Sequence, residues 1–275
     1  MKISIITINF NNADGLRKTL DSVAEQTYQE FEHIIVDGGS TDASVDFIRD
    51  YERTIANRQS PISIIWSSEP DKGIYDAMNK GVARATGDYL LFLNGGDVMV
   101  SNSVICDVYP YLCESDFVIG RTYFSVNGIR VGQSPLLTER EMSMYYMYLK
   151  GINHQSAFIK RTLLRERPYD TSVKINADWL FFVQSIIFHS ASVKFVNLFF
   201  VEFDQTGLSS NTQAVVEERK EVLQRILPER ISRDYIQIVP YYYEVIRVQW
   251  LLRHPFCYKI YRAFTTLCRK LMGDK

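Results

Sequence analysis

The chain has 275 residues, and its 46% hydrophobic content is enough to bury the core of one large domain with an appendage. Its 31 basic and 32 acidic residues give a net formal charge of -1, so no overall positive field indicates nucleic-acid binding. The four cysteines include no Cys-x-x-Cys pair, which argues against a zinc finger and favours a reduced, cytoplasmic setting.

The first hundred residues predict an alternation of strands and helices. Short apolar runs occupy residues 3–8, 33–37, 62–66 and 89–93, and apolar residues at helical spacing follow each of the first three. This alternation predicts a parallel, doubly wound sheet. The first run is too short for a signal peptide, and no apolar run approaches transmembrane length, so we expect neither secretion by that route nor a membrane span.

Polar residues cluster where the predicted strands end. The clusters are Asn9 to Asn12, Asp37 to Ser40, Glu69 to Lys72 and Asn94 to Asp97. Ligands of doubly wound sheets bind beyond the carboxyl ends of the strands, so these clusters predict the binding site.

Beyond residue 100 the predicted pattern becomes mixed. The predicted elements are strands over 117–126 and 129–131 around an Asn127-Gly128 hairpin turn, a helix from a capping box at Thr138 and Glu141 through Met147, a strand over 154–159, an apolar helix over 177–189, a strand over 193–201 and a charged helix over 212–227. We find no internal repeat apart from the early alternation, and no low-complexity linker.

Four motifs carry a resemblance to a known family. They are Ser4-Ile5-Ile6-Thr7-Ile8-Asn9-Phe10-Asn11, Val36-Asp37-Gly38-Gly39-Ser40-Thr41-Asp42, Glu69-Pro70-Asp71-Lys72-Gly73-Ile74-Tyr75-Asp76-Ala77-Met78-Asn79-Lys80-Gly81 and Phe92-Leu93-Asn94-Gly95-Gly96-Asp97. In order and spacing the chain resembles glycosyltransferase family 2, the inverting enzymes of GT-A fold, over about residues 1–205. Each motif alone is weak evidence, and the ordered set is much stronger.

The resemblance implies an α/β fold: a GT-A-like, doubly wound, mostly parallel central sheet with helices on both faces, plus a C-terminal helical appendage. We expect a catalytic domain over 1–228, with a nucleotide-binding half over 1–100 and an acceptor-binding half over 101–228. Residues 229–275 are expected to form a basic, aromatic helical segment.

The nucleotide-sugar donor is expected to lie among polar residues at the strand ends. Asp37 can accept hydrogen bonds from a nucleobase or ribose, and its alternative is a helix-capping turn residue. The family often carries a second acidic residue after this Asp, where this chain has Gly38. Thr7 and Asn9 are expected to line the same pocket. Asp71 is either another nucleoside contact or an N-cap.

The resemblance also implies a divalent metal ion, Mg²⁺ or Mn²⁺, which would neutralise the charge of the departing diphosphate. The family's Asp-x-Asp type motif is altered here, because Asn94 and Gly96 stand where carboxylates often stand. We assign the metal to Asp97 and assign Asn94 to the nucleotide sugar. The alternative for Asp97 is a loop cap.

Inverting transfer needs a base that takes the proton of the acceptor hydroxyl. Asp178, at the start of the apolar helix, stands where the family's catalytic acidic residue is found, and its alternative is a helix cap. His154 is assigned to the acceptor side, and a buried structural histidine is the alternative.

Residues 245–275 carry seven basic residues against one acidic residue, with aromatic residues among them. This composition suits a segment lying on an anionic membrane, and the alternative is a helical pair that packs its aromatics on the core. The expected location is the cytoplasm, with peripheral contact at the inner face of the plasma membrane.

Taken as a whole, the sequence predicts an inverting glycosyltransferase that moves sugar from a UDP-sugar to a saccharide or lipid-linked saccharide in cell-surface polysaccharide synthesis. The alternative is a non-catalytic nucleotide or sugar-binding module with a degraded metal site. An oxidoreductase or kinase is disfavoured, because the Gly-x-Gly-x-x-Gly and P-loop motifs are absent.

Overall fold

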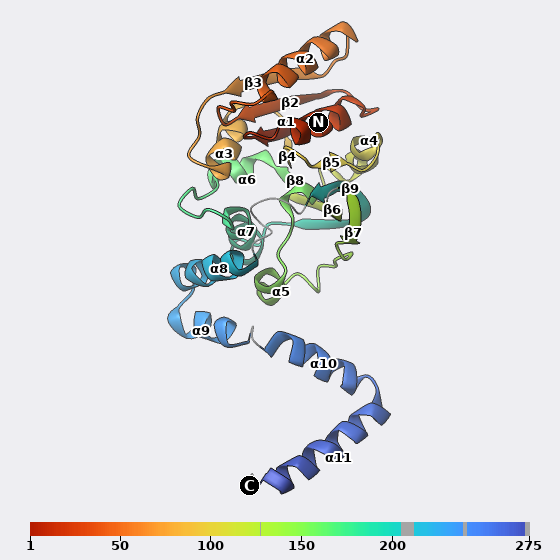
Figure 1. The fold of residues 1–275 in the computed structure, drawn as a ribbon, viewed down its shortest axis with the longest axis vertical. Helices are drawn as coiled ribbons and strands as arrows, with labels where there is room; N and C mark the ends of the chain where they lie inside the picture. Colours follow the sequence, from red (N-terminus) through yellow and green to blue (C-terminus); the bar gives the residue numbers. More distant parts are fainter. Residues whose placement is uncertain (127, 205–211, 239–240, 273–275) are drawn as a thin grey trace. The chain divides into compact units, whose positions relative to one another are not determined.

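The computed structural model describes residues 1–126, 128–204, 212–238 and 241–272. The chain divides into two compact units, Met1–Val222 and Leu223–Lys275, which are described separately. Figure 1 shows the first unit as a sheet with helices packed around it.

The first four strands form the predicted parallel sheet. They are β1 (Ile3–Asn9), β2 (Phe31–Asp37), β3 (Ser63–Ser68) and β4 (Tyr89–Asn94), arranged in the order β3-β2-β1-β4. Helices α1 (Ala13–Ala24), α2 (Ser44–Asn57) and α3 (Ile74–Arg84) make the crossovers between them. The register pairs Asn9 with Asp37 and Ile8 with Asn94, so all three polar residues lie together at the carboxyl ends of the parallel strands.

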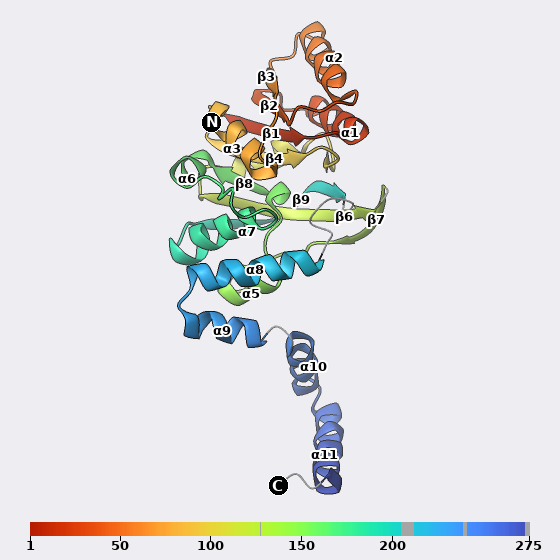
Figure 2. The ribbon, with the colours of Figure 1, turned by 60° about the vertical axis from the view of Figure 1, so that its left-hand side comes forward.

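Alternation along β1 explains why helices cover both faces. Ile5 belongs to the core cluster that includes Leu16 of α1 and Ile48 of α2. Its neighbour Ile6 faces the other way and contacts α3, where a Cβ on Gly81 would come within 2.4 Å of the Ile6 side chain. Figure 2 shows α1 and α2 on one side of the sheet and α3 on the other. The predicted doubly wound core is therefore confirmed.

The sheet continues with mixed pairing beyond β4. Strand β8 (Ala157–Lys160) runs antiparallel to β4 and to β6 (Phe117–Val126). Strand β6 pairs in parallel with β9 (Val193–Asp204), while β5 (Val98–Met99) is antiparallel to β9 and β7 (Ile129–Gln133) is antiparallel to β6. The predicted turn residue Asn127 lies outside the described residues.

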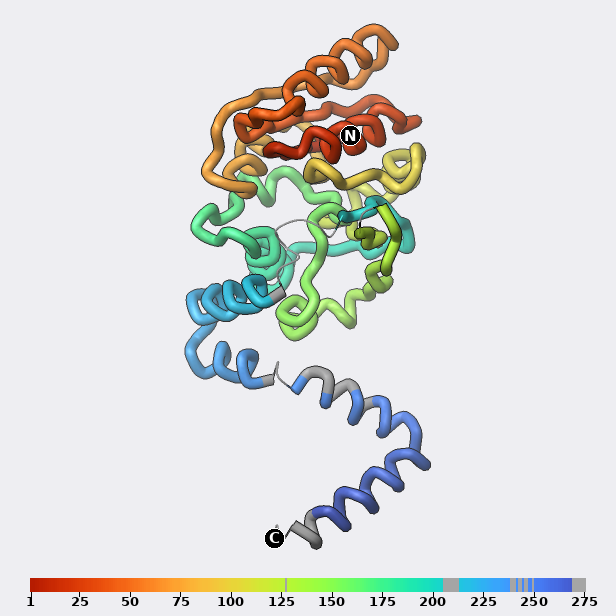
Figure 3. Tube along the Cα trace, viewed as in Figure 1, coloured from red at the N-terminus to blue at the C-terminus, as the bar shows by residue number. Residues whose placement is uncertain are grey.

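The helices of this half are short, except for the last. They are α4 (Val104–Val108), α5 (Met144–Leu149), α6 (Arg161–Glu166), α7 (Ala177–Phe182), which continues as a π-helical turn over Val183–Phe188, and α8 (Thr212–Ile226). Figure 3 traces the chain through these helices.

Two predicted elements in this half were wrong in their bounds. The helix expected from Thr138 begins at Met144, because the Ser143 hydroxyl caps it by accepting from the Tyr146 N–H at 3.2 Å. The predicted pairing of Thr138 with Glu141 forms, but it closes a turn and not a helix. The strand expected from His154 starts at Ala157, after a 3₁₀ turn over His154–Ser156.

The second unit is helical. It contains α9 (Glu229–Ile238), α10 (Tyr242–Leu252) and α11 (Pro255–Met272). Across the part of the chain that the structure describes, no helix combines the length and apolar character needed to cross a membrane.

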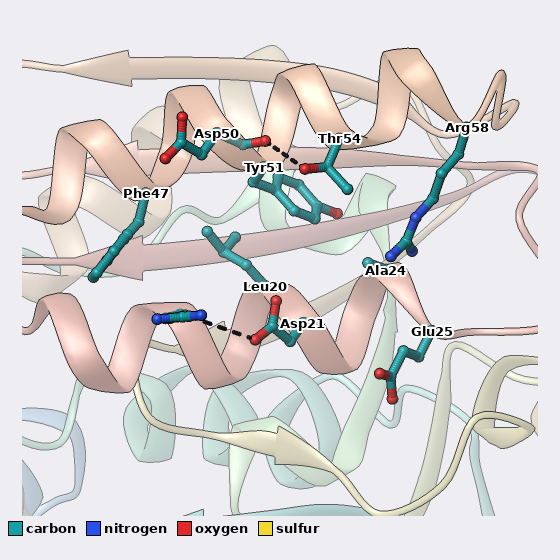
Figure 4. A pocket seen from close by; sticks show the side chains of 10 residues that line it. Leu20, Asp21, Ala24, Glu25, Phe47, Asp50, Tyr51, Thr54 and Arg58 are labelled. Carbon is teal, nitrogen blue, oxygen red and sulfur yellow. Dashed lines mark hydrogen bonds and ion pairs between the residues drawn. The ribbon is translucent and has the colours of Figure 1, made fainter.

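A surface hollow of about 290 Å³ lies between α1 and α2. Figure 4 shows Leu20 and Tyr51 at its centre, with charged side chains such as Asp50 and Arg58 around it. None of the polar residues at the carboxyl edge of the sheet lines this hollow, so it is separate from the site described below.

Candidate active site

Asp37 is the best-bonded side chain at the carboxyl edge of the sheet. Its Oδ1 accepts from Asn9 Nδ2 at 3.0 Å and from Ser40 Oγ at 2.6 Å, and its Oδ2 accepts from Ser40 N at 2.9 Å and Ser68 Oγ at 2.7 Å. Burial would raise the pKa of Asp37, but the Ser40, Ser68 and Asn9 donors outweigh it and lower the pKa. Asp37 is therefore a buried, ionised carboxylate held by neutral donors.

Asn9 joins this cluster, whereas Thr7 does not. Asn9 Nδ2 also contacts Ser44 Oγ at 2.9 Å, and its Oδ1 is buried with no donor among the described residues. The Thr7 hydroxyl instead lies 2.9 Å from Nε2 of His33, whose Nδ1 lies 2.9 Å from the Tyr51 hydroxyl. Burial lowers the pKa of His33 to about 3, so this ring is neutral beneath the site.

Asp71 occupies the space that a second acidic residue after Asp37 would need. A Cβ on Gly38 would meet Asp71 Oδ2 at 2.5 Å and the Phe10 ring at 3.2 Å. Asp71 Oδ1 accepts from the Gly73 N–H at 2.8 Å, so Asp71 also closes the turn before α3. Because Gly38 has no side chain, the Asp71 carboxylate can reach this position from another loop.

Phe10 is a candidate that sequence reasoning missed. Its side chain is 64% exposed although it lies at the end of a buried strand and beside Asp71. An exposed aromatic ring beside a carboxylate can offer its face to a planar ligand. The sequence feature that could have identified Phe10 is its place as an aromatic residue within the polar cluster Asn9 to Asn12.

Asp97 closes the loop after β4. Its Oδ2 accepts from the Asn94 N–H at 2.7 Å, and the side chain of Gln155 also donates to it. Asp97 is only 2% exposed, and this burial raises its pKa to about 6. Gly96 stands at φ +114°, a backbone conformation that side-chain-bearing residues rarely adopt, so a carboxylate at this position would strain the loop.

The described residues therefore fit a divalent cation poorly in this conformation. The Asp97 carboxylate is buried in its own loop, and no group of three His, Cys, Asp or Glu side chains gathers among the described residues. Hard cations bind several oxygen ligands, some of which substrate phosphates and water can supply. The metal role of Asp97 stays a prediction.

Asp178 and His154 form a buried pair in the second half. His154 Nδ1 lies 2.8 Å from Asp178 Oδ2, and the Tyr75 hydroxyl donates to Asp178 Oδ1 at 2.8 Å. The side chains of His154 and Asp178 are 9% and 17% exposed. Burial would raise the pKa of Asp178, but the His154 and Tyr75 contacts outweigh it, and the pKa lies below its ordinary value.

Helix α8 fixes the start of α7, where Asp178 lies. Glu218 Oε2 accepts from the Asn176 N–H at 2.8 Å and from its side-chain Nδ2 at 2.9 Å. Arg219 Nε donates to Asn176 Oδ1 at 2.9 Å, and its guanidinium lies over the Trp179 ring. The sequence did not single out Glu218 or Arg219, because nothing in a charged helix indicates that these two residues contact Asn176.

Asn94 connects the two halves of the site. It ends β4 beside β1, and its Nδ2 lies 3.4 Å from His154 Nε2. The structure therefore brings together Asn9, Asp37 and Asp71 on one side and Asn94, Asp97, His154 and Asp178 on the other. Thr7 alone among the predicted site residues points its hydroxyl elsewhere, toward His33.

Comparison with known proteins decides the family. The model for glycosyl transferase family 2 matches residues 4–187, which contain every residue of this site except those of α8. The chain belongs to glycosyl transferase family 2. This glycosyltransferase is 31% identical over 227 residues to the PGL/p-HBAD biosynthesis glycosyltransferase of Mycobacterium bovis, an alignment that covers 81% of this chain and 83% of that protein.

Other relatives agree with this assignment. An uncharacterised glycosyltransferase of Mycobacterium tuberculosis is 33% identical over 217 residues, which cover 77% of this chain and 78% of that protein. Residues 1–349 of TarS from S. aureus, solved with UDP, share the fold with a TM-score of 0.63 at 18% identity, covering 89% of this chain and 72% of that one. The mannosyltransferase PcManGT of Pyrobaculum calidifontis, solved with GDP-Man and Mn²⁺, has a TM-score of 0.56 at 17% identity. The match covers 81% of this chain and 62% of PcManGT. The predicted GT-A fold is confirmed.

Proposed function

We propose that this glycosyltransferase transfers a sugar, with inversion, from a UDP-sugar to a hydroxyl of a saccharide or lipid-linked saccharide acceptor. One observation carries the proposal: Asn94 lies between the polar strand ends and the buried Asp178–His154 pair. A donor group held at the strand ends would therefore lie next to a proton acceptor. A binding module needs no such pair.

The nucleoside is assigned to the edge formed by Asp37, Asp71 and Phe10. The exposed Phe10 ring suits stacking on a base, and Asp71 Oδ2 suits a ribose or base donor. The buried Asp37 and Asn9 would lie next to the bound nucleoside. The UDP assignment is supported by TarS, which was solved with UDP and with UDP-GlcNAc, whereas GDP-Man in PcManGT marks the competing donor.

Inversion requires one displacement, in which the acceptor oxygen attacks the anomeric carbon as the nucleotide departs from the opposite face. A base near the acceptor is enough for such a step. The Asp178–His154 pair supplies that base, and its burial excludes most water from the reacting oxygen. The acceptor class is supported by the mycobacterial relative named for PGL/p-HBAD biosynthesis.

Donor hydrolysis tests the proposal directly. The full chain is incubated with UDP-glucose, UDP-galactose, UDP-GlcNAc and GDP-mannose, with and without Mn²⁺, and release of nucleoside diphosphate is measured. We expect slow hydrolysis of one UDP-sugar, with the anomeric configuration of the freed sugar inverted when followed by NMR. Tight binding of UDP without hydrolysis or transfer would favour the binding module.

We also propose that α11 contacts an anionic membrane surface. Phe256, Ile260 and Phe264 recur every four residues along this helix and are 76%, 57% and 64% exposed. The exposed Lys259 and Arg262 lie among them, and the net formal charge of residues 245–275 is +6. Apolar side chains with basic residues nearby suit a helix lying in a lipid interface.

Liposome sedimentation tests the membrane contact in the full chain. Binding to vesicles with anionic lipid, weakened by salt and absent from neutral vesicles, is the expected result. Replacing Phe256, Ile260 and Phe264 with Ser should abolish it, while the same change at the exposed Ile129 of β7 should not. Equal binding by both variants, or no binding by the full chain, would contradict the proposal.

A further inference from the structure

One face of α3 packs against the segment that leads into α7. Tyr75 and Asn79 are four residues apart, so they lie on the same face of the helix. Asn79 Nδ2 donates to the Tyr169 carbonyl oxygen at 2.9 Å, and Asn79 Oδ1 accepts from the Tyr169 N–H at 3.0 Å. Asn79 therefore fixes α3 against this segment without any help from the Tyr75 hydroxyl.

The Tyr75 hydroxyl has two acceptors and a single hydrogen. It lies 2.6 Å from the Ile175 carbonyl oxygen and 2.8 Å from Asp178 Oδ1. While Asp178 is ionised, its charge attracts the hydrogen more strongly than the neutral carbonyl does. Once Asp178 has taken a proton, the hydrogen can turn to the Ile175 carbonyl. The buried hydroxyl therefore has a partner in both charge states of Asp178.

Contacts from several elements fix both oxygens of the Asp178 carboxylate. Tyr75 of α3 and the Trp179 N–H hold Oδ1, each at 2.8 Å, and Oδ2 lies 2.8 Å from His154 Nδ1. The Tyr75 contact comes from the first half of the site, because α3 begins directly after the turn that Asp71 closes. Side chains held in this way keep a catalytic group within a narrow range of orientations.

Burial keeps the Tyr75 hydroxyl rigid and neutral. Tyr75 is 5% exposed, and its ring lies 5.5 Å from the ring of Tyr169. Burial, together with the nearby charge of Asp178, raises the pKa of Tyr75 well above its ordinary value, so the hydroxyl keeps its hydrogen. The Tyr75 hydroxyl therefore serves as a fixed hydrogen-bond donor at the start of α7.

We infer that Tyr75 is a positioning residue, which holds the Asp178 carboxylate in the orientation that receives the proton of the acceptor hydroxyl. The inference rests on the proposed function. In that reaction the acceptor oxygen bonds to the anomeric carbon, the bond from that carbon to the phosphate oxygen breaks, and its electron pair leaves with the nucleoside diphosphate. The hydroxyl proton moves to the Asp178 carboxylate, which later releases it to water. Tyr75 acts only through Asp178.

The test is Tyr75→Phe in the full chain, which removes the hydroxyl but keeps the ring and the Asn79 contacts. Its rate of nucleoside diphosphate release is measured with the sugar nucleotide that the wild type hydrolyses. We expect kcat to fall by about 10–100-fold, the scale for a misplaced catalytic group. KM for the donor and Kd for UDP should stay at wild-type values, because no group assigned to the nucleotide is changed.

Two other tyrosines provide matched controls. Tyr169→Phe alters the neighbouring ring, whose buried hydroxyl has no hydrogen-bond partner among the described residues. Tyr89→Phe removes a hydroxyl that donates to a backbone carbonyl, that of Ser115, as the Tyr75 hydroxyl can to its own carbonyl partner. Tyr89 begins β4, at the end opposite to Asn94. Both variants should keep wild-type kcat, even if Tyr89→Phe lowers Tm as much as Tyr75→Phe does.

A double-mutant cycle shows whether Tyr75 acts through Asp178. In an Asp178→Ala background, Tyr75→Phe should lower the residual rate no further, because the carboxylate that it positions is gone. An equal fold loss in both backgrounds would overturn the inference. Wild-type kcat in Tyr75→Phe would also overturn it, as would an equal kcat loss in Tyr89→Phe.

Two further outcomes separate this inference from the proposed function. Failure of Tyr75→Phe to fold would assign its hydroxyl to stability and contradict the inference alone, since the wild type would still transfer sugar. A wild type that neither binds UDP nor hydrolyses any donor would contradict both.

Discussion

The two ends of strand β2 each hold a buried carboxylate, and they do so by different means. At the amino end, Glu32 pairs with Lys2 at 2.6 Å and accepts from Ser4 and Thr86. At the carboxyl end, Asp37 accepts from side chains that carry no charge, Asn9, Ser40 and Ser68. Both carboxylates have a lowered pKa.

The difference separates a structural carboxylate from a candidate binding carboxylate. The Lys2 ammonium group balances the charge of Glu32, and Ser4 and Thr86 donate further hydrogen bonds to its carboxylate. Hydroxyl donors leave Asp37 with its negative charge, and rotating hydroxyls can be replaced by those of a ribose. The two ends can therefore be told apart experimentally, by stability at one end and by nucleotide affinity at the other.

The largest expected effect is on stability at the amino end. Glu32→Ala would leave the Ser4 hydroxyl and the Thr86 N–H without their acceptor, whereas the Gly87 N–H would keep the Ser4 oxygen. Buried donors left in this way cost about 2–4 kcal/mol together. Thermal unfolding should show a clear drop in Tm, and calorimetry should show unchanged UDP affinity. If Glu32→Ala weakened UDP binding and left Tm unchanged, the assignment of a structural role to Glu32 would be wrong.

Next in size is the loss of affinity at the carboxyl end. Asp37→Ala should weaken UDP binding by about 10–100-fold, the usual scale for a charged hydrogen-bonding partner. The measurement is calorimetry with UDP, and Asp42→Ala, which removes an exposed carboxylate from the same turn, is the control. An unchanged Kd in Asp37→Ala would assign Asp37 to the turn alone.

The pH dependence of stability should separate Glu32 from Asp97. Burial would raise the pKa of Glu32, but hydrogen bonds from Lys2, Ser4 and Thr86 outweigh this effect and hold the pKa at about 2. Glu32 therefore stabilises the fold fully above about pH 4.5, and this stabilisation is lost as the pH falls toward 2. Burial raises the pKa of Asp97 to about 6, so the ionised form destabilises the fold as pH rises from about 4 to 6. Asp97→Asn should therefore flatten Tm across the upper window, and Glu32→Gln across the lower one.

The same Asp97 variant tests the metal. If Asp97 holds a cation with the nucleotide, Mn²⁺ plus UDP should raise Tm in the wild type by more than UDP alone, and this gain should vanish in Asp97→Asn. Equal gains in both proteins would remove Asp97 as a ligand.

The smallest expected effect is that of Phe10→Ala. Because this side chain is 64% exposed, its loss should leave Tm nearly unchanged. Loss of stacking on a base should weaken UDP binding by about 3–10-fold, in line with about 1 kcal/mol for aromatic contacts. Phe188→Ala, which removes another exposed aromatic, is the control for nonspecific effects. A Kd equal to that of wild type would exclude stacking.

The first half of the candidate site was predictable because each of its polar residues stands at the end of a predicted strand. Asn9, Asp37 and Asn94 each end a strand, and parallel pairing brings strand ends to one edge. The structure also explains Gly38, which no local pattern could, because Asp71 arrives there from a separate loop.

The second half was harder to predict because its contacts cross the chain. Tyr75 meets Asp178 from 103 residues away, and only the fold reveals that both belong to one site. His154 was singled out, but the 3₁₀ turn that orients it was mistaken for a strand. Short apolar runs do not distinguish a strand from a turn that precedes one.

The contact between α8 and the loop before α7 sets a lower limit on the catalytic fragment that could be excised from this protein. Glu218 accepts from the backbone N–H groups of Lys174, Ile175 and Asn176. A chain ending at residue 187, where the family match stops, would leave those three groups without their acceptor. Any attempt to graft or shorten this enzyme therefore has to carry α8 along, although no residue of that helix is a candidate to touch the sugar.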